Sequence, residues 1–449
     1  MTEKSMTEKS MTEKTRRRPR LSVVQDSSGA PRVMVVGAGW RFTSGISYYT
    51  CRLTNAIAEV APTSTLLMRQ LVPTALYPGR KRVGEQVNDL EYGPSVHVFD
   101  GLDWFWGPSM RKARRYMDEQ RPQVMILQWW TGAVLHSYLR LARLAKRSGC
   151  KVIIEWHEVQ DTGEARIPGV TRYVTKAMKA LLNMVDGHVV HSEYDLNLLR
   201  RTYFLPDELV TIAAHGPYDH HRQADAAPAS ATIGSVLSAV QPPVEIEDPK
   251  DFVLLYFGVV RPYKGVEDLV AAFDLLPAEV RDRTRLMLVG ETWEGWTAPR
   301  EAVAASPNRD RIEVVDRYVT DSEVSAYFAT ADAVVLPYRR SSSSGPLHIA
   351  MSSGLPVVVS RVGGLVEAAG GYEGTFFVDP EDPAGLAAVL AELPATRGHR
   401  YTDPHSWDNT VVAYGELLRR IGAATWAPAV EVGSSHPVHN HSTARHYAS

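Results

Sequence analysis

The sequence has 449 residues, of which 44% are hydrophobic and 22% are charged, and its formal net charge is -2. This composition is ordinary for a globular protein, and the length predicts two or three domains of about 100–200 residues each. The near-neutral charge argues against a nucleic-acid-binding protein. The two cysteines are too few for a disulfide framework and favour a reducing, cytoplasmic setting. No apolar run approaches the roughly 18–20 residues of a membrane span.

Both ends of the sequence are expected to lie outside the folded domains. Residues 1–31 begin with a five-residue unit repeated three times, followed by a basic cluster from Arg16 to Arg20. We expect a disordered tail rather than a secretory leader, because an apolar segment is absent there. Contact of the basic cluster with anionic lipids is the alternative. Residues 422–449, which contain several histidines, are also expected to be disordered.

Short apolar strands alternate with helical segments between residues 32 and 221. Strands are predicted at 31–39, 64–70, 95–100, 123–130, 151–157 and 187–195, and helices at 45–61, 107–120 and 136–149. Each strand is a run of apolar residues without the polar alternation of a half-exposed strand, which is typical of a buried parallel sheet. This region therefore predicts a first doubly wound α/β domain.

Residues 222–250 are rich in Ala, Pro and Ser and predict an interdomain linker. A second series of strands follows within residues 251–403, and a final helix is predicted within residues 404–421. Two such domains would point their loops into a shared cleft, since open α/β sheets bind ligands at the carboxyl ends of strands. Periplasmic-type binding proteins and sugar epimerases share this arrangement, so the motifs must decide between them.

The segment FGVVRPYKGVEDL places two cations where a strand gives way to a helix. A buried strand ends at Phe257–Gly258, a helix starts near Val266, and Arg261 and Lys264 lie between them. A helix N-terminus already attracts anions through its free N–H groups and its dipole. The pattern predicts a diphosphate site, with solvated surface cations as the alternative.

The chain resembles the retaining GT-B glycosyltransferases of the group 1 superfamily (family 4). That family typically has Gly-Arg-Leu, three variable residues and Lys-Gly. Here Gly258 and Lys264–Gly265 keep the spacing, Val259 takes the Arg position, and Arg261 is interpreted as its substitute. The stretches TSGISYYTCRLTNAIA, IIEWHEV, VVHSEYDLNLL, AAHGPYD and AMSSGLPVVVSRVGGLVE extend the resemblance in order through most of residues 33–421.

The resemblance implies an α/β GT-B fold, with an acceptor-side domain at 32–221 and a donor-binding domain at 251–403. It also implies transfer of a sugar from a nucleoside diphosphate sugar to an acceptor hydroxyl, with retention, in glycan, polysaccharide or glycolipid synthesis. The acceptor would be a carbohydrate, a lipid-linked molecule or a small molecule. Catalytic roles fall to Arg261, Lys264 and the cleft histidine His157. The expected donor contacts are Ser44, Gly45, Gly258, Ser343, Ser344, Gly345, Pro346, Leu347, His348 and Glu367.

The sequence departs from the family at a pair of glutamates, which in the family are separated by seven residues. Aligned on Ala350–Met351, the two positions hold Ser341 and Ile349, and neither can accept hydrogen bonds as a carboxylate. Pro346 suits the first position of a helix, whose backbone N–H groups could still hold the distal phosphate. We therefore expect the phosphate half of the donor site to be kept and the sugar half to be rebuilt.

Acceptor contacts are expected from Glu158, Asp161, Trp129 and Trp130, with core packing as the alternative for the tryptophans and a structural role as the alternative for His157. No metal site and no metal requirement are expected. An Asp-x-Asp motif in a convincing setting is absent, and His215, His220 and His221 would need Cys or carboxylate ligands beside them to form a Zn site.

Three alternatives stay open. The missing glutamates favour a non-catalytic GT-B-like partner subunit of another transferase, whereas a sugar epimerase or a phosphorylase could use the same fold.

The segment TRYVTKAMKALLNMV mixes Arg172, Lys176 and Lys179 with an apolar stripe. It predicts a helix packed on the domain, or a membrane-surface helix that would place the protein peripherally at the inner membrane face.

Overall fold

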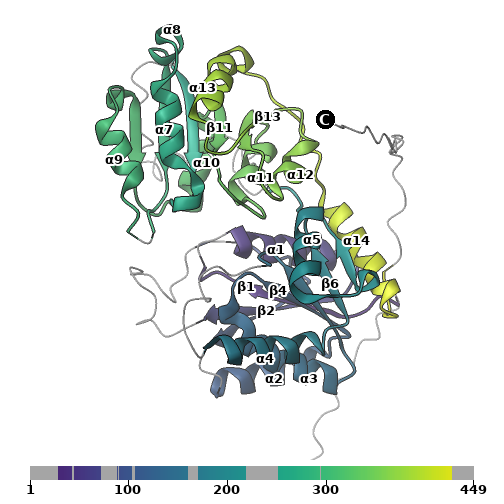
Figure 1. The fold of residues 1–449 in the computed structure, drawn as a ribbon. Coiled ribbons are helices and arrows are strands. Elements are labelled where there is room, and N and C mark those ends of the chain that lie inside the picture. The colour runs from purple at the N-terminus through teal and green to yellow at the C-terminus, as the bar shows by residue number, and fades with distance from the viewer. Residues whose placement is uncertain are drawn as a thin grey trace, which may run out of the picture.

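The computed structural model describes residues 29–42, 45–71, 88, 90–103, 107–159, 170–218, 251–293 and 295–426. These residues form two α/β domains, each built on a parallel sheet with helices on both faces (Figure 1). The predicted fold class of two doubly wound domains is thus confirmed. The predicted linker, most of both predicted tails, and Ser44, Asp161, His220 and His221 lie outside the described residues.

The N-terminal domain has a seven-stranded sheet in the order β3-β2-β1-β4-β5-β6-β7. Its strands are β1 (Val33–Ala38), β2 (Thr63–Gln70), β3 (His97–Asp103), β4 (Val124–Trp129), β5 (Lys151–Trp156), β6 (Gly187–Val190) and β7 (Val210–Ile212). The helices are α1 (Gly45–Ala58), α2 (Pro108–Gln120), α3 (Leu135–Arg147), α4 (Val170–Leu182) and α5 (Glu193–Tyr203). Strands β1 and β4 are buried along their whole length, which explains their continuous apolar sequences.

The C-terminal domain has a six-stranded sheet in the order β10-β9-β8-β11-β12-β13. Its strands are β8 (Phe252–Phe257), β9 (Thr284–Val289), β10 (Ile312–Val315), β11 (Ala333–Leu336), β12 (Val357–Ser360) and β13 (Thr375–Val378). The helices are α7 (Val266–Asp274), α8 (Ala278–Arg281), α9 (Ala298–Ala305), α10 (Asp321–Thr330), α11 (Gly345–Ser352), α12 (Leu365–Gly370) and α13 (Pro383–Glu392).

The last helix, α14 (Trp407–Arg420), returns to the N-terminal domain and packs against α1 and β7 (Figure 1). Trp407 Nε1 donates to the carbonyl of Pro217 at 3.0 Å, and Thr410 Oγ1 donates to that of Ala214 at 2.8 Å. A second tie between the domains comes from Glu367 on α12. Its carboxylate accepts the backbone N–H groups of Glu193 and Tyr194, at the start of α5, at 2.6 and 2.8 Å.

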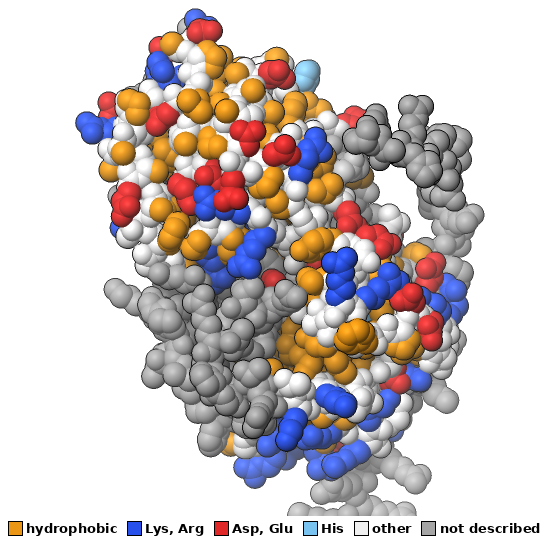
Figure 2. All heavy atoms as spheres, in the orientation of Figure 1, with side chains coloured by type: hydrophobic (Ala, Val, Ile, Leu, Met, Phe, Trp, Pro, Cys, Tyr) orange, Lys and Arg blue, Asp and Glu red, His pale blue; other side chains and the backbone are white. Residues whose placement is uncertain are grey.

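Helix α4 packs against α3, with Ala177, Met178 and Leu181 buried. Its apolar stripe therefore faces the domain, as the first of the two alternatives predicts. Lys and Arg side chains gather on the face of the domain formed by α2, α3 and α4 (Figure 2). Among the described residues, no helix combines the length and apolar character needed to cross a bilayer.

Candidate functional site

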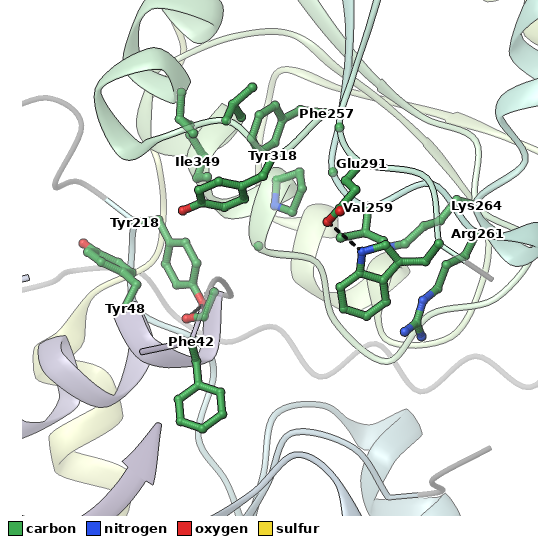
Figure 3. Close-up of a pocket in the computed structure, with 18 of the residues that line it drawn as sticks. Phe42, Tyr48, Tyr218, Phe257, Val259, Arg261, Lys264, Glu291, Tyr318 and Ile349 are labelled. Atoms are coloured by element: carbon green, nitrogen blue, oxygen red, sulfur yellow. Dashed lines mark hydrogen bonds between the residues drawn. The ribbon is translucent and has the colours of Figure 1, made fainter. Parts of the chain in front are cut away.

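A cavity of about 360 Å³ lies between the two domains, at the carboxyl ends of the strands of the C-terminal sheet. The N-terminal domain contributes Gly45 and Tyr48 from the start of α1, together with Phe42, Asn88, Leu90 and Tyr218 (Figure 3). The C-terminal domain contributes the following residues: Phe257, Gly258, Val259, Arg261, Tyr263, Lys264, Gly290, Glu291, Trp293, Arg317, Tyr318, Val319, Val324, Tyr338, Gly345, Pro346 and Ile349. The geometry thus brings together the predicted cationic loop, the predicted helix start and Gly45.

The loop after β8 places the two cations over the cavity. Gly258 leaves the strand with φ +128°, and Pro262–Lys264 then form one 3-10 turn. Gly265, with φ +62°, joins this turn to α7, and a Cβ there would clash with the carbonyl oxygen of Pro337. Glycine is needed at this junction for both its left-handed backbone and its lack of a side chain.

The two cations rest on aromatic rings. Lys264 Nζ lies 3.5 Å from the ring centroid of Tyr338, and the Arg261 guanidinium lies 4.6 Å from that of Trp293. Such faces attract cations through the ring quadrupole. Burial and the nearby charge of Arg261 lower the pKa of Lys264 to about 7, whereas Glu158 acts to raise it.

Across the cavity, α11 presents its N-terminus. Ser344 caps the helix by accepting a hydrogen bond from the N–H of Leu347 at 3.4 Å, and Pro346 lies in the first turn. Gly345 lies opposite Gly45, with Tyr218 beside both. The cavity is therefore bordered by two cations on one side and by the free N–H groups of a helix start on the other, a combination suited to an anion.

The wall beside this helix start lacks carboxylates at the two family positions. Ile349 lines the cavity with an apolar side chain that is 8% exposed. Ser341 directs its hydroxyl to the carbonyl of Ser343 at 2.7 Å. The ribose and sugar contacts that two glutamates would make are thus replaced by an apolar surface and a local turn.

Several of the predicted contacts are not among the residues that line the cavity. Trp129 is 3% exposed and packs against Trp156 in the domain core, which agrees with core packing rather than with an acceptor contact. Leu347 is fully buried, and His348 is 1% exposed, away from the cavity lining. Glu367 is not among the residues that line the cavity, and its two carboxylate oxygens accept hydrogen bonds from the start of α5.

Three other predicted residues lie close to the cavity without lining it. Trp130 packs edge-on against Phe42, which does line the cavity, with ring centroids 6.2 Å apart. Glu158 is exposed and acts electrostatically on Lys264, which brings it from the N-terminal domain towards the cleft. Ser343 lies just before the start of α11.

His157 belongs to a cluster of histidines beneath the cleft. One ring nitrogen each from His157, His191 and His215 lies within 4.8 Å of the others. His348 stacks on His215 with a ring-centroid distance of 4.8 Å. Burial and neighbouring imidazoles lower the pKa of His191 to about 4, and burial lowers that of His348 to about 3. These two rings are therefore neutral at pH 7.

The sequence analysis missed the aromatic residues of the cavity and the histidine His191. Tyr48, Tyr218, Trp293, Tyr318 and Tyr338 come from five segments far apart in the chain. Tyr48 lies within the stretch TSGISYYTCRLTNAIA and Tyr218 within AAHGPYD, but neither tyrosine was singled out there. Nothing in the spacing of the five residues indicates a shared site.

Comparison with known proteins finds a family match for the C-terminal domain. Residues 251–395 match the family described as glycosyl transferases group 1. The chain is 30% identical over 175 residues to an O-antigen chain mannosyltransferase B from Escherichia coli, covering 36% of this chain and 45% of that protein. It is 28% identical over 279 residues to a D-inositol 3-phosphate glycosyltransferase from Streptomyces scabiei, covering 57% of each chain. The chain thus spans about half the length of these curated relatives.

Solved structures match over most of the chain. A sucrose-phosphate synthase from Thermosynechococcus elongatus superposes with a TM-score of 0.55 at 17% identity, over 88% of this chain and 95% of that one. Anabaena HepE, solved in complex with UDP-glucose, gives a TM-score of 0.54 at 13% identity, over 87% and 95%. At these identities the likeness concerns the fold alone. The C-terminal domain therefore matches the group 1 glycosyltransferases, and the chain as a whole has the two-domain GT-B fold of these solved structures.

Proposed function

We propose that this protein transfers a glycosyl unit from a nucleoside diphosphate sugar to an acceptor hydroxyl, with retention at the anomeric carbon. The observation that carries this proposal is the position of Arg261 and Lys264, which face the cavity between the domains together with Gly345 and Pro346 of α11. Similar proteins are named as glycosyltransferases, and one neighbour in fold was solved with UDP-glucose.

The proposed chemistry rests on stabilising the leaving group. Negative charge grows on the β-phosphate as the glycosidic bond breaks, and preorganised cations and N–H groups at that place lower the barrier. Arg261, Lys264 and the start of α11 supply this stabilisation, so the transfer step is proposed to need no metal ion. The acceptor attacks on the leaving-group face, and the cleft between the domains limits hydrolysis by water.

The apolar wall suggests how the donor site has changed. Ile349 and Ser341 offer no carboxylate to a ribose or a sugar, whereas aromatic side chains surround the cavity. We propose that the base and sugar are held mainly by stacking and shape.

His157 has no part in this proposal, because its ring nitrogens face His191 and Glu155. Glu158 is the proposed acceptor contact. A carbohydrate, lipid-linked or small-molecule acceptor would fit, and the basic face of α2, α3 and α4 would serve peripheral membrane contact.

Calorimetric titration with UDP, GDP, ADP and TDP tests this proposal. The wild-type protein should bind one of the four selectively, and both Arg261→Ala and Lys264→Ala should abolish binding. Arg361→Ala is the matched control, because this cation is half exposed and is not among the residues that line the cavity. A folded protein that binds none of the four contradicts the proposal.

A second function is favoured by Ser341 and Ile349, which replace both family glutamates. It is that of a non-catalytic subunit which binds a donor or activates another transferase. Donor hydrolysis separates the two functions, because a subunit that only binds the donor releases no nucleoside diphosphate.

A further inference from the structure

Three histidines meet at one edge of the N-terminal sheet. His157 directly follows β5, His191 directly follows β6, and His215 lies three residues beyond β7. These three strands are neighbours in the sheet and run parallel, so their carboxyl ends meet at one edge. The three ligand atoms lie within 4.8 Å of one another, and none of the three residues lines the cavity between the domains.

The hydrogen bonds of His191 fix its tautomer. Its Nδ1 lies 2.9 Å from the carbonyl oxygen of Ala213, which can only accept, so Nδ1 carries the proton. The other nitrogen, Nε2, therefore presents a lone pair, and it lies 3.2 Å from Nδ1 of His157. This separation is close to the edge of about 3.3 Å of a tetrahedron with metal–nitrogen bonds of about 2.05 Å.

The far nitrogen of His157 faces a buried carboxylate. Nε2 lies 3.6 Å from Oε2 of Glu155, which is fully buried and also accepts hydrogen bonds from Tyr49 and Gln128 at 2.7 and 3.0 Å. If neutral His157 places its proton on Nε2, towards the carboxylate, its Nδ1 lone pair points at the lone pair of His191. A cation between these two nitrogens relieves the repulsion. Glu155 and the Ala213 carbonyl are then the outer partners that metal-bound histidines commonly have.

His215 supplies the independent observation. It is 7% exposed, and neither of its ring nitrogens has a hydrogen-bond partner. A buried imidazole without partners is costly, because it has lost its hydrogen bonds to water. Its ring centroid lies 4.2 Å from that of His191, and His348 stacks on it at 4.8 Å.

We infer that His157, His191 and His215 bind one divalent transition-metal ion, with Zn²⁺ as the best match to three imidazoles in a tetrahedral arrangement. His157 binds through Nδ1 and His191 through Nε2, and a fourth position stays open to water. The site is independent of the proposed glycosyl transfer and does not require the cavity residues.

The test uses the full chain, purified without a polyhistidine tag, stripped of metal by a chelator and titrated with Co²⁺. One equivalent should give the intense visible absorption of tetrahedral Co²⁺, and Zn²⁺ should displace it. His191→Gln should abolish this band. Glu155→Gln should keep it, with metal affinity reduced by about 10–100-fold, as expected for an outer partner. Variants that only damaged the structure would not show this difference, in which one variant loses the absorption band and the other keeps it with weaker metal binding.

Controls address other histidines. His399→Gln, at an exposed position outside the cluster, should leave the band unchanged. So should a variant in which His436, His439 and His441 of the C-terminal segment are all replaced by Gln. Wild-type protein that binds no stoichiometric tetrahedral Co²⁺ overturns the inference, even if His191→Gln does not fold. A band that survives in folded His191→Gln, or that is lost in the C-terminal variant, also overturns it.

Discussion

Affinity for a nucleoside diphosphate should fall steeply with pH, because the charge of Lys264 depends on pH near neutrality. Burial and Arg261 lower the pKa of this lysine to about 7 in the free protein. A bound diphosphate would favour the charged form and return the pKa towards the ordinary value of about 10.4. Binding should therefore take up protons, and only the protonated protein should bind tightly.

The size of the effect follows from the free protein. Between pH 7 and pH 9 the charged fraction of a group with a pKa of about 7 falls from about one half to about one hundredth. The dissociation constant should therefore rise by about 50-fold, or about 2 kcal/mol, over this range. The phosphate itself contributes little there, since its second pKa is about 6.

Calorimetric titration at pH 7, 8 and 9, in buffers of different ionisation enthalpy, measures both the affinity and the proton uptake. Lys264→Arg is the control, because arginine stays charged and its affinity should not change over this range. The pH dependence of folding stability has the opposite sign to that of binding. The unfolded chain binds more protons at this lysine between pH 7 and pH 10, so the stability of the free protein should rise with pH there. An unchanged wild-type affinity from pH 7 to 9, or the same slope in Lys264→Arg, refutes the reasoning.

Two further predictions concern stability, measured by urea denaturation. Gly265→Ala should lower the free energy of unfolding by about 2 kcal/mol or more, because left-handed strain adds to a clash with the Pro337 carbonyl. Gly398→Ala, with φ +80° and no atom within 4 Å of the added Cβ, should lose only about 1 kcal/mol from strain, and equal losses would contradict the assigned clash. Glu367→Gln should cost about 1 kcal/mol by weakening the charged cap of α5. The exposed Glu373→Gln should cost nothing measurable, and a similar loss in both would argue against the cap.

The strands were predictable wherever burial makes a sequence apolar on both faces. The continuous apolar runs of β4 and β8 are examples of strands that the sequence alone predicts. Strand β7 was missed because it has three residues, two of them only partly buried, and lies at the edge of its sheet with one neighbour. A segment this short carries no periodicity, and only its pairing with β6 makes it a strand.

The cationic loop was predictable because its residues are adjacent in sequence and follow a recognisable strand. The histidine cluster was not, because His157, His191 and His215 are 34 and 24 residues apart, and the order of β5, β6 and β7 in the sheet alone brings them together. The hydrogen-bond partners of Glu367 could not be predicted for a similar reason. The approach of α12 to α5 across the domain boundary decides its partner, and sequence spacing says nothing about that approach.

Release of a nucleoside diphosphate from nucleoside diphosphate sugars tests the proposed glycosyl transfer most directly. Purified protein is incubated with glucose and mannose donors that carry each of the nucleotides, and free diphosphate is measured over time. Slow release from one donor by the wild-type protein, and its loss in Lys264→Ala with Arg361→Ala unchanged, is the predicted result. Folded protein that binds a diphosphate but releases none from any donor, with or without added acceptors, would contradict an enzymatic role and favour the partner subunit.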